Sequence, residues 1–184
     1  MRKNFGVKPW VYPQPVLIIG TYDAEGKVDA MNAAWGGQYK ANQVMICLGA
    51  HKTTENIRLK EAFTVAFATA SQVVASDYVG IVSANDDPDK MKKSGFTTTK
   101  SELVDAPLIN ELPLALECKL IKFNEDGNVI GEIVNVSADE SILDENGNID
   151  TAKLDAIIFD PANAAYFRLG DKVGNAFADG NKLK

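Results

Sequence analysis

Short apolar segments closed by turn residues recur along this chain, and they restrict its possible folds more than any other feature. The first three span residues 16–22, 28–39 and 44–48, separated by Asp23-Ala-Glu-Gly26 and Ala41-Asn-Gln43. Apolar runs of this length between turn sequences are typical of strands. We expect an antiparallel meander, with the second strand bent near Gly36 and Gly37, because adjacent glycines within a strand mark a bend or a close backbone approach.

The rest of the chain continues this pattern and inserts helices into its middle. Further strands are predicted at residues 63–69, 97–101, 112–124 and 129–137, the last two joined by a turn at 125–128. Helices are predicted at 54–62 with Thr53 or Thr54 as N-cap, from Ser71 to about Val82, from Pro88 to Gly95, and as one turn at 151–155. Strands with short connections predict a mainly β fold, a β-barrel with helical insertions, rather than alternating β-α units.

The whole chain, residues 1–184, is interpreted as a single domain. A chain of 184 residues can bury roughly 70% of its unfolded surface, and no Ser/Gly-rich or charged linker divides it. Pro9 and Pro13 favour an irregular N-terminal arm over residues 1–14. Residues 175–184 are expected to form a loosely held tail.

Charge and hydropathy exclude several classes of partner. The net charge is -6, and the densest basic cluster, at residues 90–93, follows three aspartates, so we expect no binding to nucleic acid. No apolar run approaches the ~18 residues of a membrane helix, and no apolar segment typical of a signal peptide follows the N-terminus. We therefore expect a cytoplasmic protein without membrane contact. Cys47 and Cys118 are interpreted as reduced core thiols, with a redox pair as the alternative.

Two stretches together predict a site for a flat, phosphorylated cofactor. In residues 32–39, small residues and two glycines flank Trp35, so the backbone could approach a flat ligand closely. In residues 47–54, an apolar strand gives way to a cation and two hydroxyl groups, Lys52, Thr53 and Thr54, where a helix is expected to begin. The free N–H groups and partial positive charge of a helix start suit a phosphate, so the pair of stretches favours a nucleotide-like cofactor.

Simpler interpretations of both stretches stay open on the sequence alone. Trp35 could be an ordinary core residue, because tryptophan is usually mostly buried. Residues 51–54 could be an N-capped helix start that carries a surface lysine.

Several better-defined sites are excluded by spacing. Residues 49–54 lack the glycines of a phosphate-binding P-loop, since Ile46 and His51 stand at those positions. His51 is the only histidine, so we expect no metal site and no Ser–His–Asp arrangement. The acidic loop from Asp144 lacks the glycine and glutamate positions of a calcium loop and is interpreted as a surface turn.

Eight short stretches occur in order along the chain, and together they carry a family resemblance that runs from about Tyr12 to Gly174. They are Tyr12-Pro-Gln-Pro-Val16, Asn32-Ala-Ala-Trp35, His51-Lys-Thr-Thr-Glu-Asn-Ile57, Phe63-Thr-Val65, Asp89-Lys90, Ala106-Pro-Leu-Ile109, Leu116-Glu-Cys118 and Ile130-Gly-Glu132. The ordered set resembles the flavin reductase-like family of FMN-binding split barrels, and within it the flavoredoxin-like members. The resemblance implies a split antiparallel β-barrel, a homodimer, and FMN bound near the dimer interface.

The same resemblance implies roles for particular residues. It implies that the flavin ring and ribityl chain are lined by Asn32, Ala33, Ala34 and Trp35. It implies that backbone groups at the ring edge come from Cys47, Leu48, Gly49 and Ala50. It implies that the phosphate is held by His51, Lys52, Thr53 and Thr54, with help from Asn56 and from Lys90 on a following helix.

The activity implied is transfer of reducing equivalents through bound FMN, as in a flavin reductase that uses NADH or NADPH. Hydride transfer to the flavin requires no side-chain acid or base, so no catalytic residue is predicted. The chain has no Gly-x-Gly-x-x-Gly fingerprint, so we expect weak binding of the nicotinamide dinucleotide. The alternatives are a non-enzymatic FMN electron carrier that docks with a redox protein, and a split barrel that binds no flavin.

Overall fold

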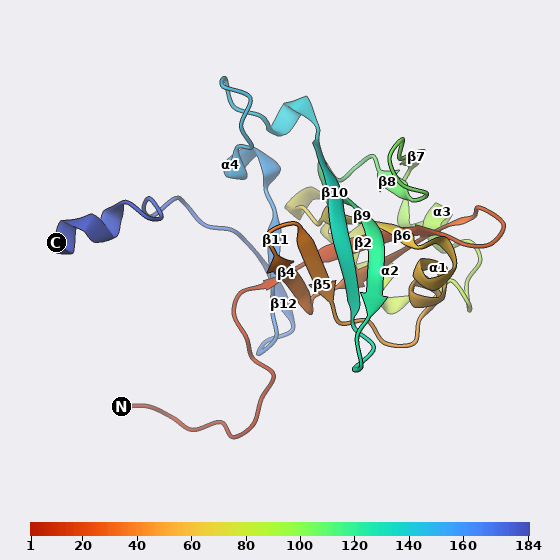
Figure 1. Ribbon diagram of the computed structural model, residues 1–184. Helices are drawn as coiled ribbons and strands as arrows, with labels where there is room; N and C mark the ends of the chain where they lie inside the picture. The colour runs from red at the N-terminus through yellow and green to blue at the C-terminus, as the bar shows by residue number, and fades with distance from the viewer.

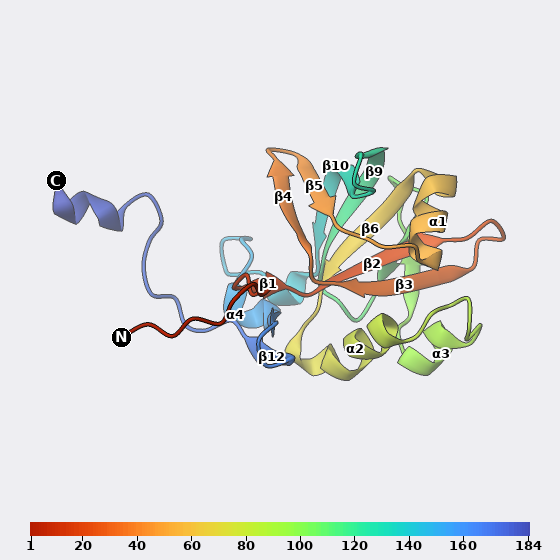
Figure 2. The same ribbon diagram turned by 90° about the horizontal axis from the view of Figure 1, so that it is seen from below.

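The computed structural model describes residues 1–184, and its central element is an antiparallel sheet of seven strands that curls into a half-barrel (Figures 1 and 2). The strand order across the sheet is β3-β2-β6-β9-β10-β5-β4. The strands are β2 (Leu17–Tyr22), β3 (Val28–Ala33), β4 (Gly36–Lys40), β5 (Gln43–Ile46), β6 (Ala62–Phe67), β9 (Leu114–Phe123) and β10 (Val129–Ala138). This architecture confirms the predicted mainly β split barrel, and β9 and β10 form the predicted hairpin.

The prediction of one strand over residues 28–39 is wrong, because this segment forms two strands at opposite edges of the sheet. β3 pairs with β2, whereas β4 pairs with β5. The break falls at Ala34 and Trp35, just before the glycines at which the sequence predicts a bend. Consequently the first strands form two separate hairpins instead of one meander. Curling brings the two edges near each other, so a short link can join them (Figure 2).

Each face of the sheet has its own apolar core. Phe63 and Val65 of β6 lie in the cluster that the curled sheet encloses, whereas Ala66 and Ala68 lie in the cluster under helix α2 (Val73–Ile81). This separation follows from the two-residue period of a strand. Besides β6, the enclosed cluster draws on five strands and on helix α1 (Lys52–Lys60) through Leu17, Ile19, Ala33, Ile46, Ile57, Cys118 and Val129.

Gly131 of β10 illustrates how tightly the enclosed core is packed. A Cβ atom at this position would overlap Cζ of the fully buried Phe63 and lie 2.9 Å from its Cε1. We therefore expect Gly131→Ala to lower the free energy of unfolding by about 1–3 kcal/mol, as overpacked cores do. Denaturant unfolding measures this change. Gly37→Ala is the control, because nothing lies within 4 Å of its added Cβ, and an equal loss there would contradict the packing argument.

Helix α1 (Lys52–Lys60) begins two residues before the predicted helix, and its N-cap is His51 instead of Thr53 or Thr54. The threonines lie in the first turn, where their hydroxyl groups bond to other partners: Thr53 to Asp29 and Thr54 to the Gly49 carbonyl. The prediction of a threonine cap fails because the helix starts at Lys52, which places both threonines inside its first turn. Their hydroxyl groups donate there to Asp29 and Gly49 instead of accepting from helix N–H groups as a cap does.

The other helices follow the predicted segments with shifted starts. A 3₁₀ turn at Ala70–Gln72 precedes α2, whose N-cap is Gln72 instead of Ser71. Helix α3 (Lys90–Ser94) begins after Asp89, so Pro88 precedes this helix, and Gly95 ends it with a φ of 79° as predicted. Helix α4 (Thr151–Leu154) is the predicted single turn. No helix is both long enough and apolar enough to span a membrane.

Two small sheets lie beside the half-barrel, and the sequence misses most of their strands. β7 (Thr98–Lys100) is predicted, but its partner β8 (Pro107–Ile109) is not. The other sheet contains β1 (Gln14–Pro15), β11 (Ile157–Asp160) and β12 (Ala165–Arg168). Strands of two to four residues carry too little alternation to be recognised. Two further 3₁₀ turns occupy Glu140–Ile142 and Asp179–Leu183.

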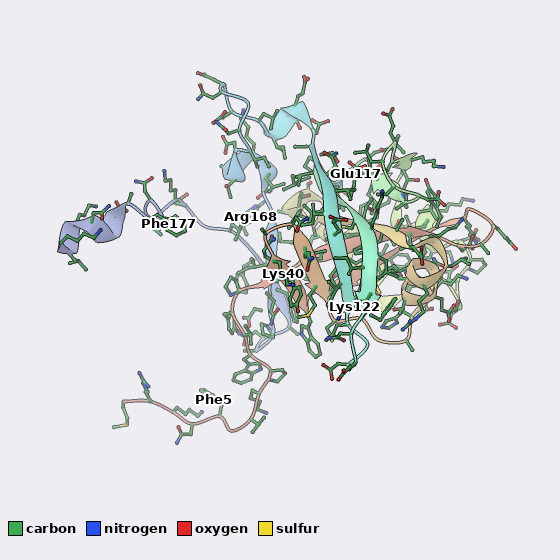
Figure 3. All side chains as sticks on the ribbon, in the orientation of Figure 1. Phe5, Lys40, Glu117, Lys122, Arg168 and Phe177 are labelled. Carbon is green, nitrogen blue, oxygen red and sulfur yellow. The ribbon has the colours of Figure 1, made fainter.

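Both ends of the chain extend away from the half-barrel on the same side (Figures 1 and 2). Figure 3 shows Phe5 and Phe177 on these segments, far from the apolar cores. Phe177 and Val173 are fully exposed, and Phe5, which is 56% exposed, packs edge-on against Trp10 of its own segment with the ring centres 5.4 Å apart.

Candidate functional site

The two stretches on which the sequence places a cofactor lie side by side in the structure. Residues of β4 pair with residues of β5, and the backbone N–H of Cys47 donates to the carbonyl oxygen of Trp35 at 2.7 Å. Trp35 is 55% exposed, so it is not the ordinary core residue of the simpler interpretation. Its ring is available as an apolar surface next to the loop that leads into α1.

The first turn of α1 presents unsatisfied backbone donors. His51 at the N-cap makes no side-chain hydrogen bond to the helix, so no side chain occupies the N–H groups that follow it. Lys52 opens the helix and takes part in none of the ion pairs of the structure. A free ammonium group beside free N–H groups at a helix start is an arrangement that favours an anion.

A buried carboxylate on β3 contacts the first turn of this helix. Asp29 of β3, 3% exposed, accepts a hydrogen bond from Thr53 Oγ1 at 2.8 Å and forms an ion pair with Lys90 Nζ at 3.1 Å. Both charged side chains are almost fully buried, with 5% of Lys90 and 4% of Asp29 exposed. The cluster Asp29–Thr53–Lys90 therefore fixes β3, α1 and α3 relative to one another.

A hollow of about 160 Å³ lies between the start of α1 and the end of α2, and we call it the α1–α2 hollow. Predicted residues that border it are His51, Lys52, Thr53 and Lys90. The opposite wall is formed by the last turn of α2 and the segment after it, residues 79–84. Of the charges at its rim, Asp29 and Lys90 neutralise each other, which leaves Lys52 as the uncompensated cation.

A second hollow lies on the other side of the same loop. It measures about 390 Å³ and is bordered by Leu48, Gly49, Ala50, His51, Thr54 and Arg58, together with the β9–β10 turn. The ring of His51 packs close to Gly49, where an added Cβ would lie 3.3 Å from Nε2. The Arg58 guanidinium stacks 3.5 Å from the centre of the Phe123 ring, which holds this wall in place.

Asn32 connects β3 to helix α2. Its Nδ2 donates to the Ser76 carbonyl oxygen at 3.0 Å, and Gly80 leaves room for its side chain, since an added Cβ there would lie 2.9 Å from Asn32 Cβ. Nearby, Tyr166 donates to Asp77 Oδ1 at 2.7 Å. Burial, and then this carboxylate, raise the pKa of Tyr166 to about 12, so the phenol remains protonated at neutral pH. The Asn32 bond thus anchors α2 to the edge strand β3, and the Tyr166 bond anchors it to β12.

Comparison with known proteins defines the family. A family model described as "Flavin reductase like domain" matches residues 11–155, well over half of the chain. The chain belongs to the flavin reductase-like family. The structure is similar to flavoredoxin of Desulfovibrio vulgaris (Miyazaki F), with 36% identity, a TM-score of 0.94, and coverage of 98% of this chain and 100% of that one. It is also similar to flavoredoxin from Methanosarcina acetivorans, with 27% identity, a TM-score of 0.88 and full coverage of both chains.

A shorter match links the chain to a curated protein of Aquifex aeolicus (strain VF5), described as an uncharacterized protein. The two are 39% identical over 67 residues, which is 35% of this chain and 34% of the Aquifex aeolicus protein. The match therefore spans about a third of that relative, and it adds nothing on activity.

Within this flavin reductase-like structure, most of the predicted site residues gather around the β5–α1 loop. Residues 48–54 border a hollow on one side of the loop or the other. Residues 32–35 border neither hollow and lie at the crossing between the sheet edges. The N–H of Cys47 is already bonded to Trp35, so within the loop the free backbone donors begin at Leu48.

Asn56 and Cys47 differ most from their predicted settings, whereas Cys118 does not. Asn56 is 2% exposed and donates to Thr21 Oγ1 at 3.1 Å, so it supports the helix from inside the fold and borders no hollow described above. Cys118 is a buried core thiol as interpreted, and burial raises its pKa to about 12. Cys47 is exposed, which corrects its assignment to the core, and both thiols are free.

The sequence interpretation misses Asp29 and the segment after α2. Asp29 stands next to Ala30 in a strand whose face turns towards α1, and an aspartate in the middle of a buried strand is a sign of a paired charge. Its partner Lys90 is distant in sequence, so only the structure reveals the pair. Ser83 and Ala84 carry no motif, and their position across from Lys52 follows from how α2 packs on β3.

Proposed function

We propose that this chain is a flavin-binding domain that holds FMN and passes reducing equivalents through it. The observation that carries the proposal is the start of α1, where free N–H groups and the unpaired Lys52 ammonium group meet at the α1–α2 hollow. This donor set fits a phosphate group. The membership of the flavin reductase-like family supports a flavin as the molecule that bears this phosphate.

The remaining predicted residues would hold the ring system. Trp35 offers an exposed aromatic face, and Leu48, Gly49 and Ala50 offer backbone groups on the adjacent loop. When bound, the flavin supplies the redox chemistry. The chain orients it: backbone N–H groups directed at the ring stabilise negative charge, and the neighbouring apolar surfaces limit the access of water.

The donor of reducing equivalents defines two versions of the proposal. We propose first a reductase that takes them from NADH or NADPH. The second version is an electron carrier that receives them from a redox protein, and the similarity over the whole chain to two proteins named flavoredoxin favours it. Anaerobic titration with NADH, NADPH and dithionite separates the two, because a carrier would be reduced by dithionite and by neither nicotinamide.

Binding of the cofactor is the first experiment. Purified protein should be yellow, or turn yellow when FMN is added, and titration should quench the fluorescence of free FMN. Colourless protein that leaves FMN fluorescence unchanged would refute the flavin proposal, whichever donor is considered.

We further propose a cytoplasmic homodimer. The exposed apolar groups of the terminal segments, such as Phe5, Val11 and Phe177, provide contact surface beyond the half-barrel. Sedimentation at micromolar concentration should give the mass of two chains, since stable dimers of this size remain associated there. A species of 19.9 kDa, the mass of one chain, would reject the dimer.

A further inference from the structure

Helix α2 is apolar on the side that faces solvent as well as on the side that packs on the sheet. Val79 is 1% exposed and belongs to the core, whereas Val74 is 80% exposed and Ile81 is 74% exposed. Val74, Tyr78 and Ile81 follow one another at helical spacing, so they lie on one side of α2. A helix that is apolar all round is normally buried, so we expect another molecule to cover this side.

A hollow of about 310 Å³ lies along the exposed side of α2, and we call its lining the α2 patch. The lining consists of apolar and aromatic side chains with one carboxylate: Val73, Val74, Asp77, Tyr78, Ile81 and Tyr166. Asp77 accepts the hydrogen bond from Tyr166 but takes part in no ion pair.

Further carboxylates lie beyond the end of α2. The Tyr78 hydroxyl group donates to Asp87 Oδ2 at 3.4 Å, which brings the acidic segment 86–89 next to the α2 patch. Asp86 and Asp89 of this segment take part in no ion pair. The α2 patch is therefore an apolar surface with an acidic rim.

Residues 1–11, which we call the basic segment, have the complementary chemistry. They include no acidic residue, and their three cations, none of which takes part in an ion pair, are Arg2, Lys3 and Lys8. The ammonium groups of Lys3 and Lys8 lie over the rings of Phe5 and Trp10, at 5.2 and 5.8 Å from the ring centres. Aromatic groups flanked by cations fit an apolar surface with an acidic rim.

The basic segment does not use the α2 patch of its own chain. No hydrogen bond joins residues 1–11 to the rest of the protein, and the first anchor is the bond from the Tyr12 hydroxyl group to Asp160. From this anchor the segment leads away from α2 (Figures 1 and 2). Its cations and aromatic rings are therefore available to a second molecule.

The terminal segments keep this path in flavoredoxin of Desulfovibrio vulgaris (Miyazaki F). Residues 1–11 and 170–184 are 11 and 15 residues long in a chain of 184. If both followed other paths there, a TM-score of 0.94 could not be reached. A path that is kept without support from the segment's own chain indicates contacts with another molecule. A second copy is present wherever this chain is, and it carries the matching α2 patch.

We propose that the basic segment of one copy docks on the α2 patch of a second copy, and the reverse, so that a dimer exchanges these segments. Phe5 and Trp10 enter the apolar hollow, and the basic side chains meet the carboxylates at its rim. An aromatic side chain buries about 150–250 Å². Four of them and the surfaces that they cover reach about 1,200 Å², the lower limit of specific interfaces. The inference rests on the homodimer of the proposed function and does not depend on the flavin.

Two full-length variants test the contact from its two sides. Phe5→Ala combined with Trp10→Ala removes both aromatic anchors, and Val74→Glu places a charge in the α2 patch. Each should raise the dissociation constant of the dimer by about a hundredfold, because each impairs both contacts of the reciprocal pair. Leu59→Glu, at a 57% exposed position of α1, is the control and should leave the constant unchanged. Sedimentation over a series of concentrations measures the constant, and circular dichroism checks that each variant is folded.

Mixing the two variants distinguishes exchange between copies from docking within one chain. The Val74→Glu chain keeps its basic segment, and the double variant keeps its α2 patch. At a concentration at which each alone is monomeric, the mixture should form a mixed dimer through one intact contact. An affinity tag on one variant detects this dimer, because the untagged variant then elutes with it. Absence of the mixed dimer would overturn the exchange.

The remaining outcomes also decide the proposal. A dimer that Val74→Glu leaves intact would show that the α2 patch is not the docking surface, while the homodimer and the flavin proposal would stand. Variants with a lower Tm and an unchanged dissociation constant would place the segment on its own chain and overturn the exchange. Unchanged protein that sediments as a monomer would overturn the homodimer together with this inference, whereas FMN titration would still judge the flavin proposal by itself.

Discussion

Lys52→Ala should weaken FMN binding on the order of tenfold to a hundredfold and leave riboflavin binding almost unchanged. Lys52 is the uncompensated cation at the α1–α2 hollow, so in the proposed complex it donates to the phosphate. A hydrogen bond to a charged group contributes about 1.5–3 kcal/mol, which corresponds to this change in the dissociation constant. Riboflavin lacks the phosphate, so its affinity should not depend on the Lys52 ammonium group. Fluorescence quenching of the two flavins gives both constants.

The same helix supplies a matched control. Lys60 lies in the last turn of α1 and pairs with Asp105 at 3.4 Å, so Lys60→Ala should leave both affinities unchanged. Lys52→Arg keeps the charge and should retain most of the FMN affinity. Equal weakening of FMN and riboflavin by Lys52→Ala would show that this loop does not hold the phosphate.

Lys90→Met should destabilise the protein by about 3–5 kcal/mol, because it leaves the Asp29 carboxylate buried without its counter-ion. For a chain of this size, that loss corresponds to a Tm lower by roughly 6–20 °C. Replacing both partners, Lys90→Met with Asp29→Asn, should recover much of the stability. The amide is uncharged and can still accept the hydrogen bond from Thr53. Calorimetry on the single and double variants measures both effects.

An exposed ion pair of α3, the helix that carries Lys90, is the control for this experiment. Lys93 pairs with Asp87 at 2.6 Å, but its side chain is 55% exposed, so solvent screens the interaction. Lys93→Met should therefore shift Tm far less than Lys90→Met. If the two substitutions had equal effects, burial would not be what makes the Asp29–Lys90 pair important.

The sequence predicts which residues form most strands of the sheet, but it does not predict the place of each strand within the sheet. Residues 16–22, 63–69 and 129–137 show apolar patterns that depend on local alternation, and each forms a strand within a residue or two of these bounds. The segment 28–39 reads as one strand because its composition does not change at Ala34, although the chain crosses there to the other edge. That crossing depends on how far the sheet curls, which is a property of all seven strands.

In the candidate site, too, the sequence predicts what depends on local pattern and misses what depends on tertiary contacts. Residues 32–35 and 47–54 are close in sequence, so a single turn can bring them side by side. In the structure the backbone hydrogen bond from Cys47 to Trp35 joins them. The Asp29–Thr53–Lys90 cluster joins three elements, and the hydroxyl bond from Thr53 replaces the helix cap that local propensity predicts. The partner of the Thr53 hydroxyl group is set by the packing of β3 against α1, which pattern and propensity do not describe.

The crossing at Ala34 and Trp35 also has a kinetic consequence. The β2–β3, β4–β5 and β9–β10 hairpins can form early because their partners are close in sequence, but β5 reaches β10 only after a long loop closes. Trp35 joins the two edges, so its final surroundings exist only once β5 has docked on β10. During refolding, recovery of FMN quenching should therefore lag behind the return of secondary structure, and stopped-flow records of both signals that coincide would contradict this order. The ability to bind a ligand would then mark completion of the slowest pairing in the sheet.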